Sequence, residues 1–221
     1  MQAPTALVAI AGIGLAGEPH AHALSPRQVL IVGDEAYRRF DLPDGALGEN
    51  LRVPGSTVDW RSGARLRIGA EVELWLTFAC EPCGHLDRRH SGLSRRIGRH
   101  RGMLARVLRG GVFSRADPVM HLGDAVLPQP AALYDDDWRT RVRTVACAVP
   151  AGRWIGYAQL AVMAGVASTY CRAFPRVLAS LPPEVRARIR PVAQALPEPA
   201  WDGAGLYDRT APSQRPGVEK R

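Results

Sequence analysis

The amino-acid sequence predicts an α+β protein in which a β-barrel precedes a small, mostly helical domain. Short apolar runs separated by Gly and Pro turns fill the first 130 residues, a spacing typical of a barrel or sandwich. From residue 138 onward the runs lengthen and follow helical periodicity. Charge divides at the same place: residues 1–137 carry 16 Arg and 16 acidic residues, and residues 138–221 carry 13 basic and 5 acidic ones.

The β-rich part contains two segments with clear two-residue alternation. Residues 65–69 and 71–78 alternate polar and apolar side chains, which predicts half-buried strands. Residues 34–40 are predicted to form a helical turn with Asp34 as its N-cap, and residues 45–50 a tight turn. The remaining predicted strands or strand pieces are 27–33, 51–53, 57–60, 101–109 and 118–127.

The second part is predicted to be helical after an Asp- and Pro-rich linker. Asp137 is placed to cap a helix that begins near Trp138, and Gly165 to end a later one. The predicted helices are 138–148, 157–165, 168–180 and 182–196. The expected boundaries are a barrel at 1–130, a linker at 131–138, a helical domain at 139–208 and a disordered tail at 209–221.

Composition excludes several classes of protein. No apolar run approaches the roughly 18 residues that a membrane helix requires, so no membrane partner is expected. The apolar residues 6–16 lack a basic segment before them, which argues against a signal peptide. The four cysteines do not form the framework of a small secreted protein, so a reduced, cytoplasmic protein is the expectation.

One cysteine stands at a position suited to chemistry. Cys83 follows Glu81 and Pro82 directly after a predicted strand, and a thiolate is both a soft metal ligand and a nucleophile. Cys80 precedes it by three residues, so zinc is a second possibility, with His85 and His90 at uncommon spacings. A purely structural interpretation makes Cys80 a core residue and Cys83 a buried thiol.

Seven short motifs in order give the first part a family resemblance. Residues about 5–128 resemble a MOSC domain, the β-barrel module named after the C-terminal part of molybdenum cofactor sulfurase. The motifs are Gly14–Gly17, Arg27–Val32, Gly45–Leu51, Gly63–Gly69, Glu81–Cys83, Arg101–Gly102 and Gly123–Asp124. The sequence departs from the family near the first glycines, where His20 ends Gly-Glu-Pro-His instead of Gly-Asp-Arg-His.

The MOSC resemblance implies a ligand and a set of site residues. Cys83 would carry sulfur or ligate molybdenum, with Glu49 and Asn50 beside it as acceptor and donor. Six arginines from Arg88 to Arg101 would assist the thiolate and bind a cofactor phosphate, Arg101 being counted as cofactor-binding. His20 would either keep the family role or be an exposed loop histidine. The implied cofactor is molybdenum or the molybdenum cofactor, the implied activity sulfur transfer or molybdenum-dependent catalysis, and pyridoxal phosphate binding is a family-level association.

The second part also carries a resemblance. It is similar to the DNA-binding winged helix-turn-helix of alkylguanine-DNA alkyltransferases. The matching pieces are Pro150, Gly152, Tyr157, Gln159–Ala161, Ala164–Gly165 and Arg172–Ala173. The resemblance implies contact of residues 139–208 with double-stranded DNA, in which Arg172 enters the duplex and Tyr157 helps to rotate a nucleotide out. Arg172 and Arg176 are four residues apart, as on one face of a recognition helix.

The alkyl-accepting motif Pro-Cys-His-Arg is absent, so the protein is not expected to be an active alkyltransferase. Three functions remain open. The first is a MOSC-type protein that handles a small sulfur- or molybdenum-containing ligand through Cys83. The second is a non-enzymatic DNA-binding protein that senses damaged bases or regulates transcription, and the third is a protein-interaction module.

Overall fold

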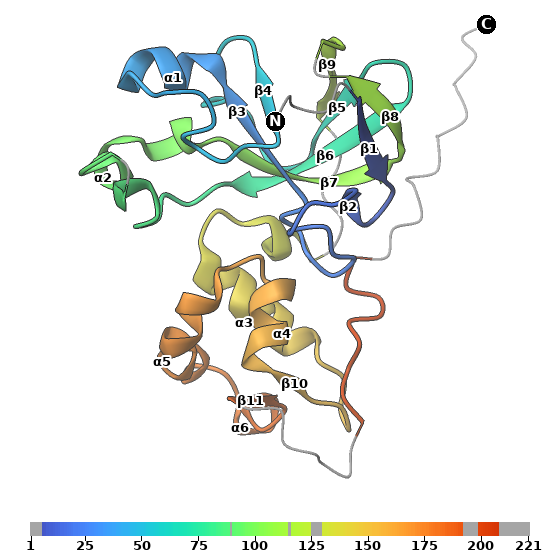
Figure 1. The fold of residues 1–221 in the computed structure, drawn as a ribbon. Helices are drawn as coiled ribbons and strands as arrows, with labels where there is room; N and C mark the ends of the chain where they lie inside the picture. The colour runs from blue at the N-terminus through green and yellow to red at the C-terminus, as the bar shows by residue number, and fades with distance from the viewer. Residues whose placement is uncertain (1–5, 89, 115, 125–129, 192–198, 208–221) are drawn as a thin grey trace, which may run out of the picture.

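A computed structural model gives the fold and describes all residues except 1–5, 89, 115, 125–129, 192–198 and 208–221 (Figure 1). The predicted disordered tail and the ends of the predicted elements 118–127 and 182–196 lie outside the described residues. The described chain forms a curled β-sheet structure above a smaller helical part (Figure 1). Among the described helices, none is long and apolar enough to cross a membrane.

Two sheets build the β part. A six-stranded sheet has the order β4-β3-β7-β6-β5-β9, and a three-stranded sheet has the order β2-β1-β8. All neighbouring strands in both sheets are antiparallel except β3 and β4, which are parallel. The strands are β1 (Ala6–Ile10), β2 (Gly14–Leu15), β3 (Val29–Gly33), β4 (Leu51–Val53), β5 (Ala64–Ile68), β6 (Val72–Ala79), β7 (Met103–Arg109), β8 (Gly111–Ser114) and β9 (Val119–Asp124).

Most strand predictions are confirmed within a few residues. Residues 57–60 are the exception, because they form a turn in which the Trp60 amide donates to the Thr57 carbonyl. Strands β1, β2 and β8 were not predicted. The start of the predicted strand 101–109 is instead the end of the 3₁₀ turn η2 (Gly98–Arg101), which follows η1 (Leu86–Arg88) and the short helix α2 (Leu93–Arg96).

Helix α1 (Asp34–Phe40) forms where it was predicted, but its cap differs. Gly33 occupies the N-cap position, and Asp34 is the first helical residue. The Asp34 carboxylate accepts a hydrogen bond from the Gly55 amide at 2.7 Å and pairs with Arg38 at 2.7 Å. The hydrogen bond from Arg38 is the main reason that the pKa of Asp34 is lowered. Asp34 therefore fastens α1 to the turn after β4 instead of capping the helix.

The side chains of strand β6 switch to different apolar clusters near the end of the strand. Leu74 and Leu76 belong to the barrel core. A register irregularity against β7 lies between Leu76 and Ala79, and Phe78 belongs to a different cluster beneath α1 and α2. The Thr77 hydroxyl donates to the Pro26 carbonyl at 2.9 Å. Such bulges re-aim side chains, and here the bulge directs the chain that leads to Cys83 toward the helical part.

The helical part packs on the outer face of the sheet (Figure 1). Its core contains Trp75 of β6 together with the buried residues of the helices, so one apolar cluster joins both parts. Its elements are η3 (Ala131–Tyr134), α3 (Trp138–Ala148), β10 (Ile155–Gly156), α4 (Tyr157–Met163), η4 (Ser168–Ala173), α5 (Phe174–Leu178), α6 (Pro183–Arg186) and β11 (Ile189–Arg190).

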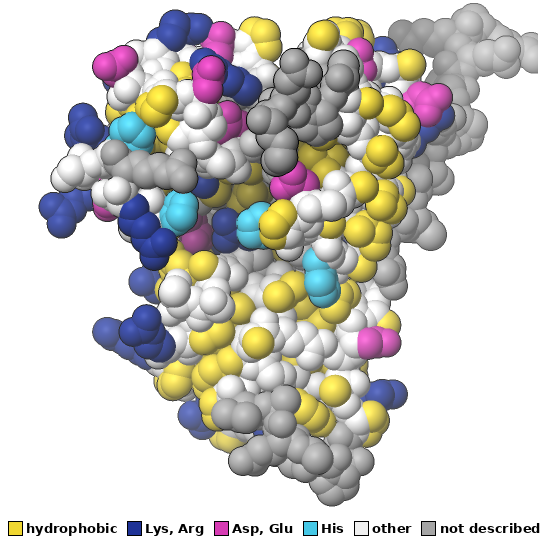
Figure 2. Space-filling model, viewed as in Figure 1, with side chains coloured by type: hydrophobic (Ala, Val, Ile, Leu, Met, Phe, Trp, Pro, Cys, Tyr) yellow, Lys and Arg dark blue, Asp and Glu magenta, His cyan; other side chains and the backbone are white. Residues whose placement is uncertain are grey.

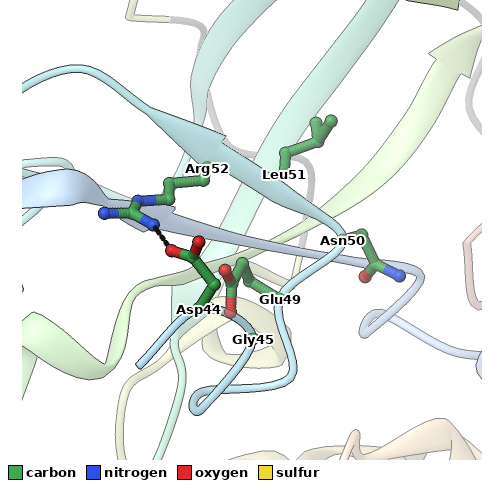
Figure 3. Close-up of a pocket in the computed structure, with 6 residues that line it drawn as sticks. All are labelled: Asp44, Gly45, Glu49, Asn50, Leu51 and Arg52. Atoms are coloured by element: carbon green, nitrogen blue, oxygen red, sulfur yellow. Dashed lines mark hydrogen bonds and ion pairs between the residues drawn. The ribbon is translucent and has the colours of Figure 1, made fainter. Parts of the chain in front are cut away.

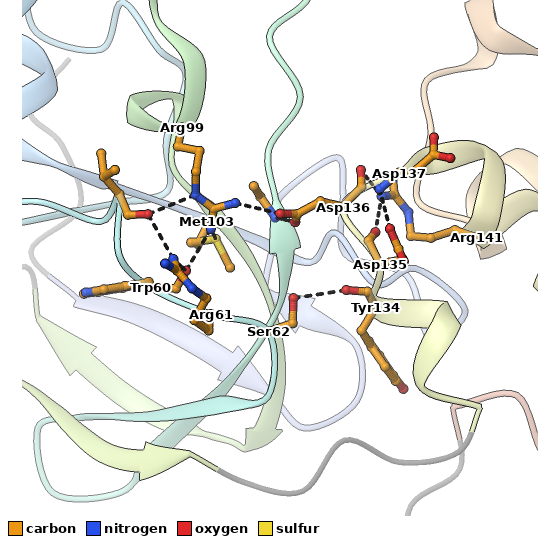
Figure 4. A network of polar contacts seen from close by, with 12 residues as sticks. Trp60, Arg61, Ser62, Arg99, Met103, Tyr134, Asp135, Asp136, Asp137 and Arg141 are labelled. Carbon is orange, nitrogen blue, oxygen red and sulfur yellow. Dashed lines mark hydrogen bonds and ion pairs between the residues drawn. The ribbon is translucent and has the colours of Figure 1, made fainter.

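The segment 131–138, predicted to be a linker, contains packed residues. Leu133 and Tyr134 are buried, and the Trp75 and Tyr134 rings lie 4.5 Å apart. The Ser62 hydroxyl donates to the Tyr134 carbonyl at 3.0 Å, as Figure 4 shows. These contacts fasten the start of the helical part to the sheet.

The helix predictions have mixed outcomes. Helix α3 matches 138–148, and Asp137 caps it by accepting from the Arg139 amide at 3.1 Å. Helix α4 ends at Met163, two residues before Gly165, whose φ of +63° is left-handed. The predicted helix 168–180 is divided into the 3₁₀ segment η4 and α5, because Pro175 starts a new helix and cannot continue the old one.

The predicted helix 182–196 is confirmed at its start and wrong in its described part beyond Arg186. Only α6 is helical, and Ile189 and Arg190 instead form β11, which pairs in parallel with β10. The N-cap position of η4 is Ala167, and no side chain caps it. A helical part is therefore observed after the barrel, whereas a winged helix-turn-helix is not shown.

Gly165 provides a test of the contact between the two parts. A Cβ atom at this position would lie 2.6 Å from both Phe78 and Pro26, which belong to the β part. Gly152 also has a positive φ, but a Cβ there would meet nothing within 4 Å. Overpacking costs about 1–3 kcal/mol, so Gly165→Ala should destabilise the protein by that much more than Gly152→Ala in urea unfolding. Equal losses would contradict the close packing.

Candidate functional site

Cys83 follows the end of β6 by four residues and stands two residues after Glu81, which pairs with Arg141 of the helical part. Its side chain is half-buried, whereas Cys80 is buried in the apolar cluster beneath α1 and α2. We call the surroundings of Cys83 the seam and define it by Arg27, Glu81, Cys83, Arg141 and Tyr170. Figure 2 shows that the surface is hollowed between the two parts and that histidine, arginine and acidic side chains gather there.

The seam is closed by an ion pair between Glu81 and Arg141. The Arg141 Nη2 atom lies 2.7 Å from Glu81 Oε1, and the Arg141 side chain is 0% exposed. Arg141 also donates to three main-chain carbonyls of the helical part: Asp135 at 2.6 Å, Asp136 at 3.1 Å and Ala164 at 2.9 Å (Figure 4 draws the first two). Burial lowers the pKa of Arg141, and the charge of Glu81 opposes that effect.

The Arg141 guanidinium also lies over an aromatic ring of the β part. Its Cζ atom is 3.6 Å from the centre of the Phe78 ring, a cation–π contact inside the protein. Arg27, which precedes β3, reaches in the other direction and donates to the Gly165 carbonyl at 3.3 Å. The segment from Phe78 to Cys83 is thus held by groups from the helical part.

Tyr170 brings a phenol to the seam from η4. Its ring packs edge-on against Trp138 with ring centres 4.8 Å apart, and its amide closes a turn on the Ala167 carbonyl. Burial is the main reason that the pKa of Tyr170 is raised. The charges of Glu81 and Cys83 and hydrogen bonding to Glu81 add to the rise. The phenol is therefore within electrostatic range of Glu81 and Cys83.

His20 lies on an exposed loop. Shielding of the ring by its neighbours lowers the pKa of His20, and the positive charge of Arg27 lowers it further. His20 is thus within electrostatic range of Arg27, which is a seam residue. Its part in a ligand site stays a prediction.

The six arginines from Arg88 to Arg101 do not act as one group. Arg88, Arg95 and Arg96 are exposed, and position 89 lies outside the described residues. Arg99 binds the carbonyls of Val58 and Trp60 and pairs with Asp136 at 2.6 Å, as Figure 4 shows. It is a structural residue that joins the β part to the segment before α3.

Arg101 is different because two of its buried nitrogen atoms lack partners. The residue is 9% exposed, and its Nε and Nη1 atoms make no hydrogen bond within the described structure. Its neighbour Gly102 accepts a hydrogen bond from the Cys80 amide at 2.8 Å, so the chain carrying Arg101 runs beside the chain leading to Cys83. Buried polar atoms without partners require an explanation such as an anionic ligand or a water molecule.

Glu49 and Asn50 line a separate hollow. Tyr37 donates to Glu49, and the Leu30 amide donates to Asn50 Oδ1 at 2.8 Å. The charge and hydrogen bond of Glu49 join burial in raising the pKa of Tyr37. The hollow holds about 370 Å³ and is lined by Asp44, Gly45, Glu49, Asn50, Leu51 and Arg52, with Arg52 paired to Asp44 (Figure 3).

These contacts assign Glu49 and Asn50 a clear local role. They join the Gly45–Leu51 turn to α1 and β3, and the hydrogen bonds described for them do not include Cys83. The predicted placement of the two side chains as acceptor and donor beside Cys83 stays a prediction.

A multi-residue metal centre is not formed by the described residues. No group of three or more His, Cys, Asp and Glu side chains is arranged to hold a metal within the described part of the chain. Cys80 is buried in the core and His85 is exposed. Cys83 is thus the half-buried thiol of the seam and the residue there whose chemistry suits a soft metal or sulfur.

The predicted DNA-contacting residues lie on different elements. Arg172 lies near the end of η4 and Arg176 on α5, and both are exposed. Tyr157 begins α4, is half-buried and packs edge-on against Phe174 with ring centres 5.4 Å apart. The predicted helix 182–196 contains three further arginines, which lie on different elements. Arg186 ends α6, Arg190 lies on β11, and Arg188 between them donates to the Val149 carbonyl at 2.9 Å.

No local pattern in the sequence indicates that the seam contains Arg141, Tyr170 and Arg27. Arg141 lies in a predicted helix with several arginines, and nothing in the local pattern separates it from its more exposed neighbours Arg139 and Arg143. Its burial depends on Glu81, sixty residues earlier.

The fold and the seam define a β-barrel domain that presents one cysteine at the end of a strand. Residues 19–126 match the family model of the MOSC domain. None of the curated proteins matches the chain.

Several solved structures are similar to the chain at low identity. YiiM from Escherichia coli is 20% identical with a TM-score of 0.47, and the alignment covers 81% of this chain and 88% of that one. The YuaD protein from Bacillus subtilis is 20% identical with a TM-score of 0.47, over 53% and 85% of the two chains. A hypothetical protein is 20% identical with a TM-score of 0.49, over 81% and 86%.

Substitutions of Arg99 and Arg101 are expected to have different effects on the free energy of unfolding. Arg101→Met should leave the free energy of unfolding unchanged or raise it by about 1 kcal/mol, because it removes buried donors that lack partners. Arg99→Met should lower it by about 2–3 kcal/mol, because the carbonyls of Val58 and Trp60 and the Asp136 carboxylate lose their partner. Urea unfolding of both variants measures this; a large loss in Arg101→Met would show that Arg101 supports the fold.

Proposed function

We propose that the protein carries sulfur or binds molybdenum through Cys83, as a MOSC domain with an attached helical part. The observation that carries the proposal is the placement of Cys83: it is half-buried, follows β6 by four residues and stands two residues after Glu81, which pairs with the buried Arg141 of the helical part. At the family level, MOSC domains are associated with the molybdenum cofactor. This association supports sulfur or molybdenum as the ligand.

The residues present fit such a group. Arg101 offers buried donor atoms without partners, which suit a phosphate or another anion, and Cys83 offers a soft thiolate. Cys83 would hold the metal and Arg101 the phosphate of a molybdenum cofactor, with His20 and Arg27 at the edge. When bound, the cofactor would supply two-electron redox chemistry. Pyridoxal phosphate binding rests on the family association alone, because no lysine lies in the seam and Lys220 is the chain's single one.

Sulfur carriage requires only the chain and a donor. The Cys83 thiolate attacks the outer sulfur of a donor hydropersulfide, R–S–SH, and the S–S bond of the donor breaks. The donor leaves as a thiolate and takes a proton from water, and Cys83 becomes a hydropersulfide. The electron count is unchanged, so no oxidant is needed.

Elemental analysis and intact mass spectrometry test the proposal. Protein expressed with molybdate and treated with an alkyl hydropersulfide should carry molybdenum or one added sulfur, and Cys83→Ser should lose it completely. Cys147→Ser is the matched control, because Cys147 is an exposed cysteine on α3 away from the seam. If Cys83→Ser retains the same load as wild type, Cys83 is not the carrier.

Binding of double-stranded DNA by residues 139–208 is the second candidate. The observation that favours it is the exposure of Arg172 and Arg176 together with the excess of basic residues after position 137. Basic side chains on phosphates give affinity that falls with salt. The protein would then sense damaged bases or regulate transcription without alkyl transfer.

Fluorescence anisotropy with a labelled duplex at two salt concentrations tests the DNA candidate. Arg172→Ala with Arg176→Ala should weaken binding about tenfold or more and flatten the salt dependence, since two positive charges in contact with the duplex are removed. Arg139→Ala with Arg143→Ala is a control of equal charge on α3. Equal weakening in both double variants would indicate nonspecific attraction, and no binding by wild type would remove the candidate.

A further inference from the structure

We propose that Arg88, Arg95 and Arg96, which we call the outer arginines, bind the phosphates of double-stranded DNA together with Arg172 and Arg176. DNA then lies against both parts of the protein. The inference rests on the DNA-binding candidate and deepens it, because it adds arginines of the β part to those of the helical part. It is independent of the proposed sulfur chemistry.

The outer arginines belong to a strongly basic segment of the β part. Residues 84–102 contain six Arg and one acidic residue. Two of these arginines are engaged within the protein: Arg99 pairs with Asp136 and binds two carbonyls, and Arg101 is 9% exposed. The outer arginines are exposed, and none of them forms an ion pair within the described part of the chain. Their charge is therefore available to a partner.

The local structure directs the outer arginines toward solvent. Leu93 and Ile97 are four residues apart and 0% exposed, and both belong to the apolar cluster beneath α1 and α2. Residues at this spacing share one face of a helix, so the two arginines of α2 lie on the other side. The Ser94 amide donates to Asp87 Oδ1 at 2.9 Å, which fastens η1, with Arg88 as its last residue, to α2. The three charges are thus presented together by two short elements that the core holds in place.

A chain of contacts connects the outer arginines with Arg172. Arg99, which follows α2, lies 2.6 Å from Asp136 of the segment before α3. Trp138 begins α3 and packs edge-on against Tyr170 of η4, two residues before Arg172, with ring centres 4.8 Å apart. Figure 2 shows dark blue side chains along the edge of the molecule that carries α2 and α5 in Figure 1, above and below the hollow. The two groups of arginines therefore line one edge of the protein.

The character of this edge favours duplex DNA over other anionic partners. The planar guanidinium of arginine binds phosphate in a bidentate fashion. Among the described residues, the large apolar side chains that are exposed lie on β1, β8, β9 and α4, and none lies on η1, α2, η4 or α5. A membrane-binding surface would carry such side chains beside its basic ones. None of these exposed side chains is aromatic, whereas the binding of single strands uses aromatic stacking.

Fluorescence anisotropy with a short labelled duplex over a series of salt concentrations tests the inference. Arg95→Ala with Arg96→Ala should weaken binding about tenfold and reduce the slope of log K against log salt by about 2, because each phosphate contact contributes roughly 0.9 to that slope. The variant Arg95→Lys with Arg96→Lys keeps both charges and should bind nearly as well as wild type. Arg109→Ala with Arg153→Ala is the matched control, because both residues are exposed, at the end of β7 and shortly before β10, and should change the affinity little.

The outcomes separate the inference from the candidate on which it rests. Wild type that binds, and that loses affinity in Arg172→Ala with Arg176→Ala but not in Arg95→Ala with Arg96→Ala, would overturn the inference and leave the candidate standing. Loss of affinity only on changing the outer arginines would overturn the joint surface, as would equal weakening in the matched control. Wild type that does not bind the duplex would overturn both, including the case in which it sediments with vesicles that contain phosphatidylserine.

Discussion

The contact between Arg141 and Glu81 is the interaction on which the site depends. A guanidinium with no exposed surface is costly to bury unless its donors are satisfied, and Arg141 satisfies them with a carboxylate of the β part and carbonyls of the helical part. Because its partners come from both sides, the ion pair can form only when the two parts are docked. The segment that leads to Cys83 is thereby fixed by the same contact that holds the protein together.

Strand β6 of the sheet also contributes to the contact between the two parts. The irregularity in β6 after Leu76 lets Phe78 leave the barrel core and lie under the Arg141 guanidinium. Trp75, on the outer face of the same strand, joins the core of the helical part. One strand thus serves the barrel, the interface and the approach to the cysteine, so a change in its register would disturb all three.

Sequence patterns predicted the secondary-structure elements that depend on local side-chain chemistry. The alternation in residues 65–69 and 71–78 identified β5 and β6, and Asp137 marked the start of α3. The prediction for 182–196 was wrong because pairing of Ile189 with Ile155 overrode helical periodicity. Cys83 was identifiable from its place after a strand, whereas Arg141 was not, since its role arises from a contact across sixty residues. The same limit applied to Arg99 and Arg101, which look alike in sequence and differ completely in their contacts.

A double-mutant cycle on Glu81→Gln and Arg141→Met tests whether this ion pair joins the two parts. The free energy of unfolding is measured for wild type, both single variants and the double variant. We expect Arg141→Met alone to cost about 3 kcal/mol, and the double variant to be more stable than the sum of the single losses by at least about 1 kcal/mol. Additive losses would contradict the role given to the pair, because they would mean that Glu81 and Arg141 do not stabilise each other.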